Sequence, residues 1–342
     1  MRSTGSPMIA RIVLTASLLA LTGCGLVYDA VQWIYPIAKD DLQRVCARKR
    51  LRVGISVEPF RPFVFPAVFT DEGLRITGMD VDLVRELASA LERRCGREDP
   101  VIPTLHLVRV RDQFVELNEN KLDLIVSAVT ANVPLEQAAG IAYSIPYYDD
   151  GAIGGMARSR ELAQSIRTRF GAPAQNGEGG TPASRAFEGL RVAVPELRSP
   201  YVYAKEYLER SELILCDSLP AAFESQNPPV DVILGKLPVL RYIVTRVRKD
   251  WHLIEWADGV PLRLMREQYA VAMAEENYRL RLFVNDTLFR LRESGRLEEL
   301  RRKWHDDFYA YPRRAATEGL PFSVEDLPQH YDQGTCRWMT SR

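Results

Sequence analysis

The chain has 342 residues, of which 46% are hydrophobic, and its 45 basic residues balance its 45 acidic ones. This length and hydrophobic content suffice for one large core or two medium ones, and they exclude a chain that is disordered throughout. A net charge of zero excludes a global electrostatic attraction to nucleic acid or to an anionic membrane. The local basic run at residues 246–249 is therefore interpreted as a solvated helix face.

The first 24 residues have the organisation of a bacterial export signal. Arg2 and Arg11 precede an apolar run over residues 12–21, which has about half the length that a membrane-spanning helix needs. The run leads to Leu-Thr-Gly-Cys at residues 21–24, which resembles a lipobox, the motif of bacterial lipoproteins. An ordinary signal peptide with an incidental cysteine is the alternative. We expect acylation of Cys24 and anchoring at the periplasmic side of the cell envelope.

Four further cysteines, Cys46, Cys95, Cys216 and Cys336, would lie in an oxidising compartment. An even number of cysteines there predicts disulfide bonds, although four cysteines allow three pairings. One arrangement joins Cys46 to Cys95 within one structural unit and Cys216 to Cys336 at the C-terminal tail. No pair has the Cys-x-x-Cys spacing of a zinc site, and we expect no metal and no cofactor.

The first predicted strand follows a tether expected over residues 25–49. Apolar residues alternate over residues 51–57, which indicates the strand, and Asp80 is expected to cap the helix that follows. A second strand is expected over residues 101–110. Strand, helix and strand in this order indicate a parallel α/β unit.

The stretch over residues 123–148 is expected to form one wall of a ligand cleft. Its apolar beginning predicts a buried strand, and the hydroxyl groups of Ser127 and Thr130 follow where that strand would end. Open α/β sheets bind ligands at this edge.

A second α/β unit is predicted in the C-terminal half. A glycine-rich strand begins near residue 151, and residues 171–185 lack periodicity, which is typical of a surface loop. Short apolar strands then alternate with helices over residues 192–234. Another strand is predicted over residues 269–273, and helical spacing continues to Trp304. Beyond Phe308 we expect the chain to wrap the surface or to hang loose.

Six blocks in this order resemble the polar-amino-acid class of bacterial solute-binding proteins that serve ABC importers. The blocks read LRVGISVEPFRPFVF, GMDVDLVRELASAL, KLDLIVSAVTANVPLEQ with YSIPYY, FEGLRVAV, VDVILGKLPVLRYIV and EENYRLRLFVNDTLFRLRESGRLEELRRKWH. The resemblance implies an α/β fold of two lobes, each a mixed, mostly parallel sheet with flanking helices, which trap ligand as they close. It implies crossing strands near residues 150–158 and 258–270. Lobe 1 would comprise residues 50–154 with 266–310, lobe 2 residues 155–265, and the C-terminal tail residues 311–342.

The resemblance also implies where a ligand would bind. Phe60 stands where the family places an aromatic ring over the ligand, and Ser127 and Thr130 stand where it places small donors. Core packing of Phe60 and capping of the strand end by the hydroxyl groups are the alternatives. Gln137 replaces the arginine that clamps the ligand's carboxylate, and Lys236 replaces the aspartate that pairs with its ammonium.

These departures change the expected ligand. A neutral amide cannot replace a bidentate guanidinium, and an ammonium group facing Lys236 would be left unpaired. Leu197 and Arg198 replace a Gly-Thr pair of the family, and Ser199 follows them. Arg198 and Lys236, together with Arg61, could accept a carboxylate or phosphate, unless they point to solvent as most basic side chains do. We therefore expect a small polar or anionic solute and not a zwitterionic α-amino acid.

The expected function is binding and not catalysis. We expect a monomeric solute-binding lipoprotein whose partner is an ABC permease or another envelope protein, with no nucleic acid. One alternative is a periplasmic dehydratase-like enzyme on the same fold, for which Glu58 and Glu196 are the carboxylate candidates near the cleft. A second alternative is a sensor or scaffold lipoprotein that no longer binds a small ligand.

Overall fold

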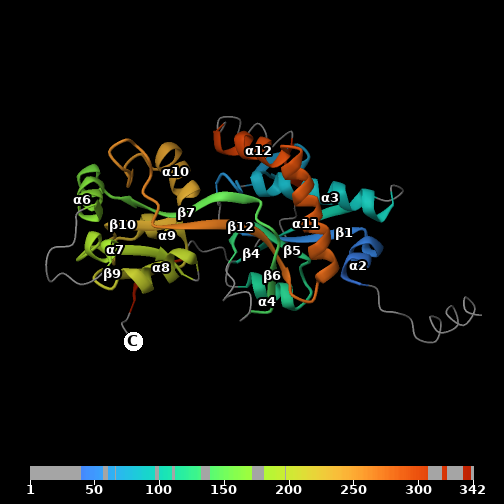
Figure 1. Ribbon diagram of the computed structural model, residues 1–342, viewed down its shortest axis with the longest axis horizontal. Helices are drawn as coiled ribbons and strands as arrows, with labels where there is room; N and C mark the ends of the chain where they lie inside the picture. The colour runs from blue at the N-terminus through green and yellow to red at the C-terminus, as the bar shows by residue number, and fades with distance from the viewer. Residues whose placement is uncertain are drawn as a thin grey trace, which may run out of the picture.

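The computed structural model describes residues 40–56, 61–65, 67–96, 100–109, 112–131, 139–171, 181–196, 198–306, 318–321 and 334–339. Figure 1 shows two lobes that lie side by side and are joined by two long strands. These crossing strands are β7 (Tyr148–Ala157) and β12 (Met265–Ala274).

Lobe 1 holds β1 and the N-terminal elements that surround it, together with the helices near the C-terminus. Its elements are α2 (Asp41–Arg48), β1 (Arg50–Ser56), β2 (Val68–Thr70), β3 (Gly73–Ile76), α3 (Met79–Cys95), β4 (Ile102–Val108), α4 (Gln113–Asn118), β5 (Leu124–Thr130), β6 (Ile141–Tyr143), α11 (Tyr278–Glu293), α12 (Arg296–Arg301), the π-helical turn η1 (Arg302–Asp306) and β13 (Leu320–Pro321).

Lobe 2 holds the elements between the crossing strands and one strand from the tail. Its elements are α6 (Arg160–Gly171), α7 (Pro182–Ala186), β8 (Arg191–Pro195), α8 (Ser199–Tyr207), β9 (Glu212–Cys216), α9 (Leu219–Glu224), β10 (Val232–Lys236), α10 (Leu237–Arg246), β11 (His252–Leu253) and β14 (Cys336–Trp338).

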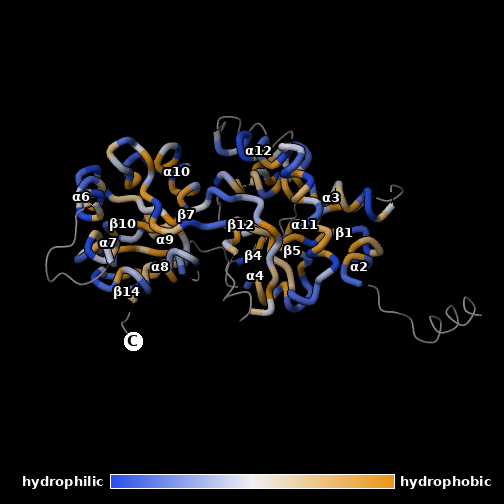
Figure 2. The backbone as a smooth tube through the Cα atoms, viewed as in Figure 1, coloured by the Kyte–Doolittle hydropathy of each residue, from blue (hydrophilic) through white to orange (hydrophobic). Residues whose placement is uncertain are grey.

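One continuous sheet runs through both lobes in the order β14-β9-β8-β10-β7-β12-β5-β1-β4. In lobe 1, β1 pairs in parallel with β4 and β5, and in lobe 2, β8 pairs in parallel with β9 and β10. The crossing strands pair antiparallel to each other. Figure 2 shows that the strands β5 and β10 are largely apolar, whereas the outer helices α6 and α12 are largely polar. The predicted α/β fold with two lobes and two crossing strands is confirmed.

The glycines of β7 allow close packing in lobe 2. A Cβ atom on Gly154 would lie 2.7 Å from Cδ1 of Leu237, and one on Gly155 would lie 2.9 Å from Cδ1 of Ile254. Both distances are shorter than real Cβ contacts, so a larger residue at either position would require the side chain of Leu237 or Ile254 to shift. The other crossing strand, β12, starts at Met265, which is earlier than Tyr269, where the sequence pattern began the strand, and later than residue 258, where the resemblance began the crossing.

The end of the expected tether is a folded helix. Helix α2 begins after Asp40, whose carboxylate accepts a hydrogen bond from the backbone N–H of Gln43. Val45 is buried, and the carboxylate of Asp41 accepts the backbone N–H of Leu280 at 2.6 Å. The tether interpretation is therefore wrong for residues 41–48. This helix has few apolar residues, and it is stabilised by its N-terminal cap and by its contact with α11.

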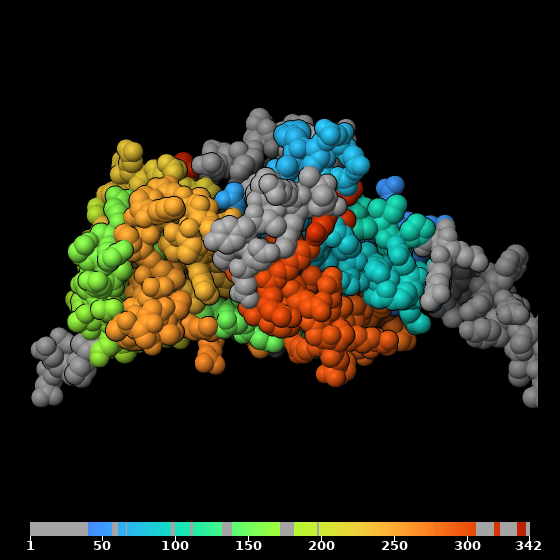
Figure 3. Space-filling view, turned by 90° about the horizontal axis from the view of Figure 1, so that it is seen from above, coloured from blue at the N-terminus to red at the C-terminus, as the bar shows by residue number. Residues whose placement is uncertain are grey.

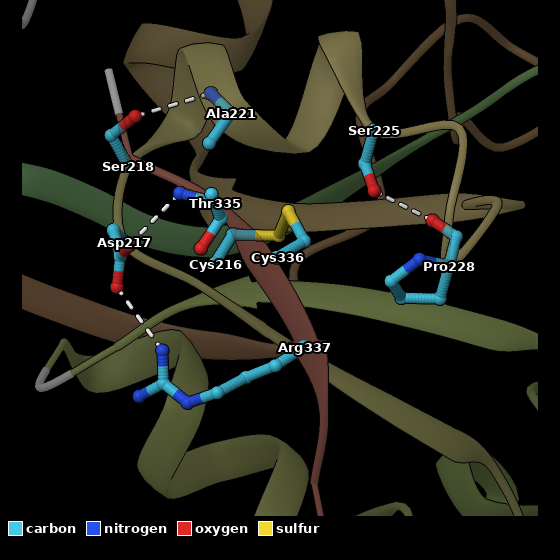
Figure 4. The surroundings of a disulfide bond; sticks show 9 residues. All are labelled: Cys216, Asp217, Ser218, Ala221, Ser225, Pro228, Thr335, Cys336 and Arg337. Atoms are coloured by element: carbon cyan, nitrogen blue, oxygen red, sulfur yellow. Dashed lines mark hydrogen bonds and ion pairs between the residues drawn. A yellow bond between two sulfur atoms is a disulfide. The ribbon is translucent and has the colours of Figure 1, made fainter. Parts of the chain in front are cut away.

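The tail adds a strand to each lobe. Strand β13 pairs with β3 in lobe 1, and β14 pairs antiparallel with β9 at the edge of lobe 2. Cys336 lies opposite Cys216 in that register, and the two form a disulfide bond. Figure 4 shows this bond beside Asp217, which accepts the backbone N–H of Thr335. The expected loose or wrapping tail is thus an ordered edge strand at residues 336–338.

The second disulfide bond joins α2 to the end of α3, through Cys46 and Cys95. Both bridges of the arrangement considered above are therefore present. Among the described residues, no helix combines the length and the apolar character that crossing a membrane requires.

Replacing Cys216 and Cys336 together by alanine should lower the free energy of unfolding by about 2–4 kcal/mol, because the bridge closes a loop of 120 residues. Urea denaturation under oxidising conditions measures this change. The matched control replaces Cys46 and Cys95, whose bridge spans 49 residues, and the entropic effect of that change should be smaller. A wild-type unfolding midpoint for the first variant would show that backbone pairing alone holds β14.

Candidate functional site

Polar side chains from both lobes and from a crossing strand meet at one point. Lys236, at the end of β10, donates a hydrogen bond of 2.6 Å to Oγ1 of Thr130, at the end of β5. The Thr130 hydroxyl in turn donates to Oε1 of Glu267 on β12 at 3.1 Å. Oγ of Ser199, the first residue of α8, lies 3.4 Å from Oγ1 of Thr130. One hydroxyl group of lobe 1 therefore links a lysine of lobe 2 to a carboxylate of the crossing strand.

Lys236 is a buried cation. Only 5% of the residue is exposed, and its ammonium lies 3.7 Å from Oε2 of Glu267 and 4.1 Å from the centre of the Tyr269 ring. Burial lowers the pKa of Lys236 to about 8, while the charge of Glu267 acts in the opposite direction. The ammonium therefore stays mostly protonated at neutral pH, stabilised by a carboxylate and a ring face.

Glu267 is the residue of this site that the sequence analysis missed. The sequence analysis named no carboxylate beside Lys236, and the structure places Glu267 of the crossing strand 3.7 Å from its ammonium. The strand indicated by the sequence pattern began at Tyr269, and the crossing implied by the resemblance, near residues 258–270, contained Glu267 without giving it a role. Side chains alternate between the two faces of a strand, and Glu267 and Tyr269 are buried while Arg266 and Gln268 are exposed. Extending the predicted strand by two residues towards the N-terminus would therefore have put Glu267 on the buried face, with Tyr269.

Arg198 approaches the end of β1 from lobe 2. Its Nη2 atom lies 3.4 Å from Oγ of Ser56, the last residue of β1. The backbone N–H of Ser56 donates to Oγ of Ser127 at 3.0 Å, and Ser127 is fully buried. This geometry fits the alternative reading of Ser127, in which its hydroxyl group holds a strand end in place.

Arg61 lies at a different contact between the lobes. Its guanidinium carbon is 6.0 Å from the centre of the Tyr242 ring on α10, and the ring of Phe65 packs edge-on against the same tyrosine. The Nε atom of Arg61 is buried without a hydrogen-bond partner among the described residues. Arg61 therefore packs against lobe 2 and does not join the group around Thr130.

Several predicted site residues lie outside the described part of the chain, namely Cys24, Glu58, Phe60, Gln137 and Leu197. Glu196, the other carboxylate candidate for catalysis, forms an ion pair of 2.6 Å with Nη2 of Arg337 in the tail. Among the described residues, no cluster of histidine, cysteine, aspartate and glutamate side chains could hold a metal ion.

A buried carboxylate supports the lobe 1 edge of the site. Oδ1 of Asp80 accepts the hydroxyl proton of Tyr147 at 2.7 Å, and Oδ2 accepts the backbone N–H of Ala128 at 2.8 Å. Ala128 has a φ of 45°, a left-handed conformation that is unusual for a residue with a Cβ atom. The expectation that Asp80 caps α3 is wrong, because Gly78 precedes the helix and Asp80 lies in its first turn, facing β5.

Burial raises the pKa of Asp80 to about 7, although the hydrogen bonds from Tyr147 and Ala128 favour its charged form. The Asp80 carboxyl group therefore titrates near neutral pH, beside the strand that carries Thr130.

An aromatic cluster joins the two crossing strands to Phe63 and His305. The rings of Tyr148 on β7 and Tyr269 on β12 stack at 5.4 Å, and His305 stacks on Tyr148 at 4.9 Å. Phe63 packs edge-on against all three rings. Burial lowers the pKa of His305 to about 3, so this imidazole is neutral under physiological conditions.

The sequence model of the bacterial extracellular solute-binding proteins, family 3, matches residues 51–307. No curated protein matches the chain. Among solved structures, a mutant of ArgBP from T. maritima has 24% sequence identity and a TM-score of 0.59, covering 78% of this chain and 100% of that chain.

Two further structures are similar. An amino acid ABC transporter substrate-binding protein, AbpA from Streptococcus pneumoniae, bound to L-arginine, has 20% identity and a TM-score of 0.61, covering 77% of this chain and 98% of that chain. The ancestral amino acid-binding protein AncCDT-1, a precursor of cyclohexadienyl dehydratase, has 20% identity and a TM-score of 0.58, covering 78% and 100% respectively. At these identities the likenesses show the fold alone.

Replacing Glu267 by glutamine should leave the ammonium of Lys236 buried without its counter-charge. We expect a loss of about 3–5 kcal/mol in the free energy of unfolding at pH 6. The loss should shrink as the pH rises towards about 8, the pKa of Lys236, and should be small above it, because the neutral amine needs no counter-charge. Denaturant unfolding at several pH values measures it, with the double variant Lys236→Met, Glu267→Gln as the matched control. A loss that is independent of pH would contradict the pairing.

Replacing Asp80 by asparagine should remove one component of the pH dependence of stability. The native pKa of about 7 exceeds the value of 3.8 for the free group, so the native state holds an extra proton between these values. This proton stabilises the wild type most at low pH, and that stability is lost as the pH rises through 7, at about 1.4 kcal/mol per pH unit at most. The difference between wild-type and variant unfolding free energies, measured from pH 4 to 8, should show this slope. Parallel pH profiles would contradict it.

Proposed function

The chain belongs to the bacterial extracellular solute-binding proteins of family 3, and we propose that it captures a small solute with an anionic group between its two lobes for an ABC importer. The observation that carries this proposal is the meeting of lobe 1, lobe 2 and a crossing strand around the Thr130 hydroxyl. A solute held there would contact groups from both lobes at once. Its binding would therefore favour the closed arrangement of the lobes.

The charges around Thr130 support an anionic solute, but for a reason that differs from the one indicated by the sequence. Glu267 balances the charge of Lys236, so this pair carries no net charge for a ligand. Arg198 adds a guanidinium group, which reaches the cleft edge beside Ser56. A carboxylate or phosphate would meet the cation of Arg198, whereas the ammonium of an α-amino acid would meet a carboxylate that Lys236 already uses.

The remaining parts of the proposal concern location and assembly. We propose that the chain is a monomer, held at the periplasmic side of the envelope by acylation of Cys24, and that it binds its solute without turnover. The lobe limits proposed from the sequence, at residues 154 and 265, fall within β7 and at the first residue of β12. Both limits therefore lie on the strands that connect the lobes.

A thermal-shift panel of matched acids tests the proposal. Glutarate or succinate, or inorganic phosphate, should raise the melting temperature more than glutamate or aspartate does, because only the amino acids bring an ammonium group. A ligand at a hundred times its Kd adds about 2.7 kcal/mol of stability. Arg198→Ala should abolish the shift, whereas Arg167→Ala on α6 should not change it. A shift with common amino acids alone would contradict the anionic solute, and no shift with any solute would support a sensor or scaffold.

A further inference from the structure

A groove of about 700 Å³ lies on lobe 1, and its lining includes none of the residues around Thr130. It runs between α3 and α11 and reaches Leu42 of α2 at one end. Figure 3 shows α11 and α12, in orange-red, lying against α3, in teal, at the surface of lobe 1. We call this the basic groove, because its wall carries the side chains of Arg93, Arg94, Arg279 and Arg290.

The basic groove concentrates positive charge in a chain whose total charge is zero. Four guanidinium groups line it against one carboxylate, that of Asp286, which leaves a net of three positive charges. Asp286 pairs with Arg290 at 3.1 Å. Arg93 donates to Oγ of Ser89, which is a neutral partner. The groove therefore has a local field that the overall composition hides.

An exposed apolar stripe runs along α11 beside these charges. Tyr278, Leu282 and Phe289 are 52%, 43% and 55% exposed. Their spacings of four and seven residues place them on one face of the helix, and Leu282 itself lines the basic groove. Large apolar side chains that border arginine side chains are typical of proteins that lie on a membrane surface.

We propose that the basic groove and the apolar stripe of α11 bind the surface of an anionic phospholipid bilayer. The guanidinium groups would receive phosphate headgroups, and Leu282 and Phe289 would enter the boundary with the acyl chains. A small free anion would need the charges but not the stripe, so the combination favours a membrane over a soluble phosphate. This inference is independent of the solute proposed above.

The place of the groove in the chain agrees with a membrane partner. Leu42 lies two residues after the start of the described chain, and Cys24 is the expected acylation site. The residues between Cys24 and Asp40 can span at most about 55 Å. An anchor at Cys24 would therefore keep the basic groove close to the bilayer, where weak electrostatic contacts suffice to orient lobe 1.

The test uses the mature chain with its expected lipid on Cys24, purified from cells and incorporated into vesicles. The vesicles consist of phosphatidylcholine, with or without phosphatidylglycerol. Leu282→Cys carries an environment-sensitive dye, and Val202→Cys on α8 of lobe 2, which is 51% exposed, carries it as the control. We expect the dye at position 282 to shift to the blue and to be quenched by nitroxide lipids only in the phosphatidylglycerol vesicles. The dye at position 202 should report water in both kinds of vesicle.

Charge reversal then identifies the groups responsible. Arg94→Glu with Arg279→Glu should lower the quenching at position 282 about tenfold or more, since each arginine near an anionic surface contributes a severalfold factor. Arg160→Glu with Arg167→Glu on α6 changes the total charge equally and should have no effect. The proposal would be overturned if the dyes at positions 282 and 202 responded equally, or if the response at position 282 did not depend on phosphatidylglycerol. It would also be overturned if the two double variants had equal effects. An absence of any response to phosphatidylglycerol would instead favour an acidic protein as the partner of the basic groove.

Discussion

Lys236 can be buried only because Glu267 and Thr130 lie beside it, and this requirement connects the parts of the cleft. The lysine ends β10, the threonine ends β5, and the glutamate lies on the crossing strand β12. A charge removed from water needs a counter-charge and hydrogen-bond partners nearby, or it shifts its pKa and becomes neutral. The lowered pKa of Lys236, about 8, shows that both effects operate here. Any movement that separates the lobes must also break the contact of Lys236 with Thr130.

The lobe 1 side of this network depends on a second buried charge. Asp80 accepts the N–H of Ala128 and so stabilises a left-handed residue two positions before Thr130. Strained backbone of this kind persists where surrounding contacts hold it, and it occurs often at functional sites. The two networks are electrostatically coupled, because the charge of Lys236 lowers the pKa of Asp80. A change in the charge of Asp80 near neutral pH therefore alters the electrostatic environment of Lys236.

The elements that could be predicted from the sequence are those with a clear local pattern of apolar residues. Alternation of apolar residues located β1, a short apolar run located β8, helical spacing located α3 and α11, and the family resemblance placed the crossing strands. What escaped prediction depends on contacts between distant residues. Glu267 acquires its role by pairing with Lys236 across the lobes, and β14 becomes a strand only because β9 offers an edge and Cys216 a bond partner. Helix α2 escaped because its stability comes from a cap and from α11, and its apolar residues are few.

The two groups of cations in lobe 1 and in the cleft show why net charge alone is a poor guide to binding. Lys236 lies in a region of low dielectric, where one carboxylate nearly cancels it and the field outside is small. The arginines of the basic groove are exposed, so none of them requires a partner for folding, and three of their charges remain for an external anion. The buried cation of Lys236 is therefore paired within the fold, whereas the exposed arginines of the basic groove can bind an external anion. A total charge of zero, which argues against attraction of the whole chain to a membrane, is compatible with one basic face that acts within a Debye length of about 8 Å.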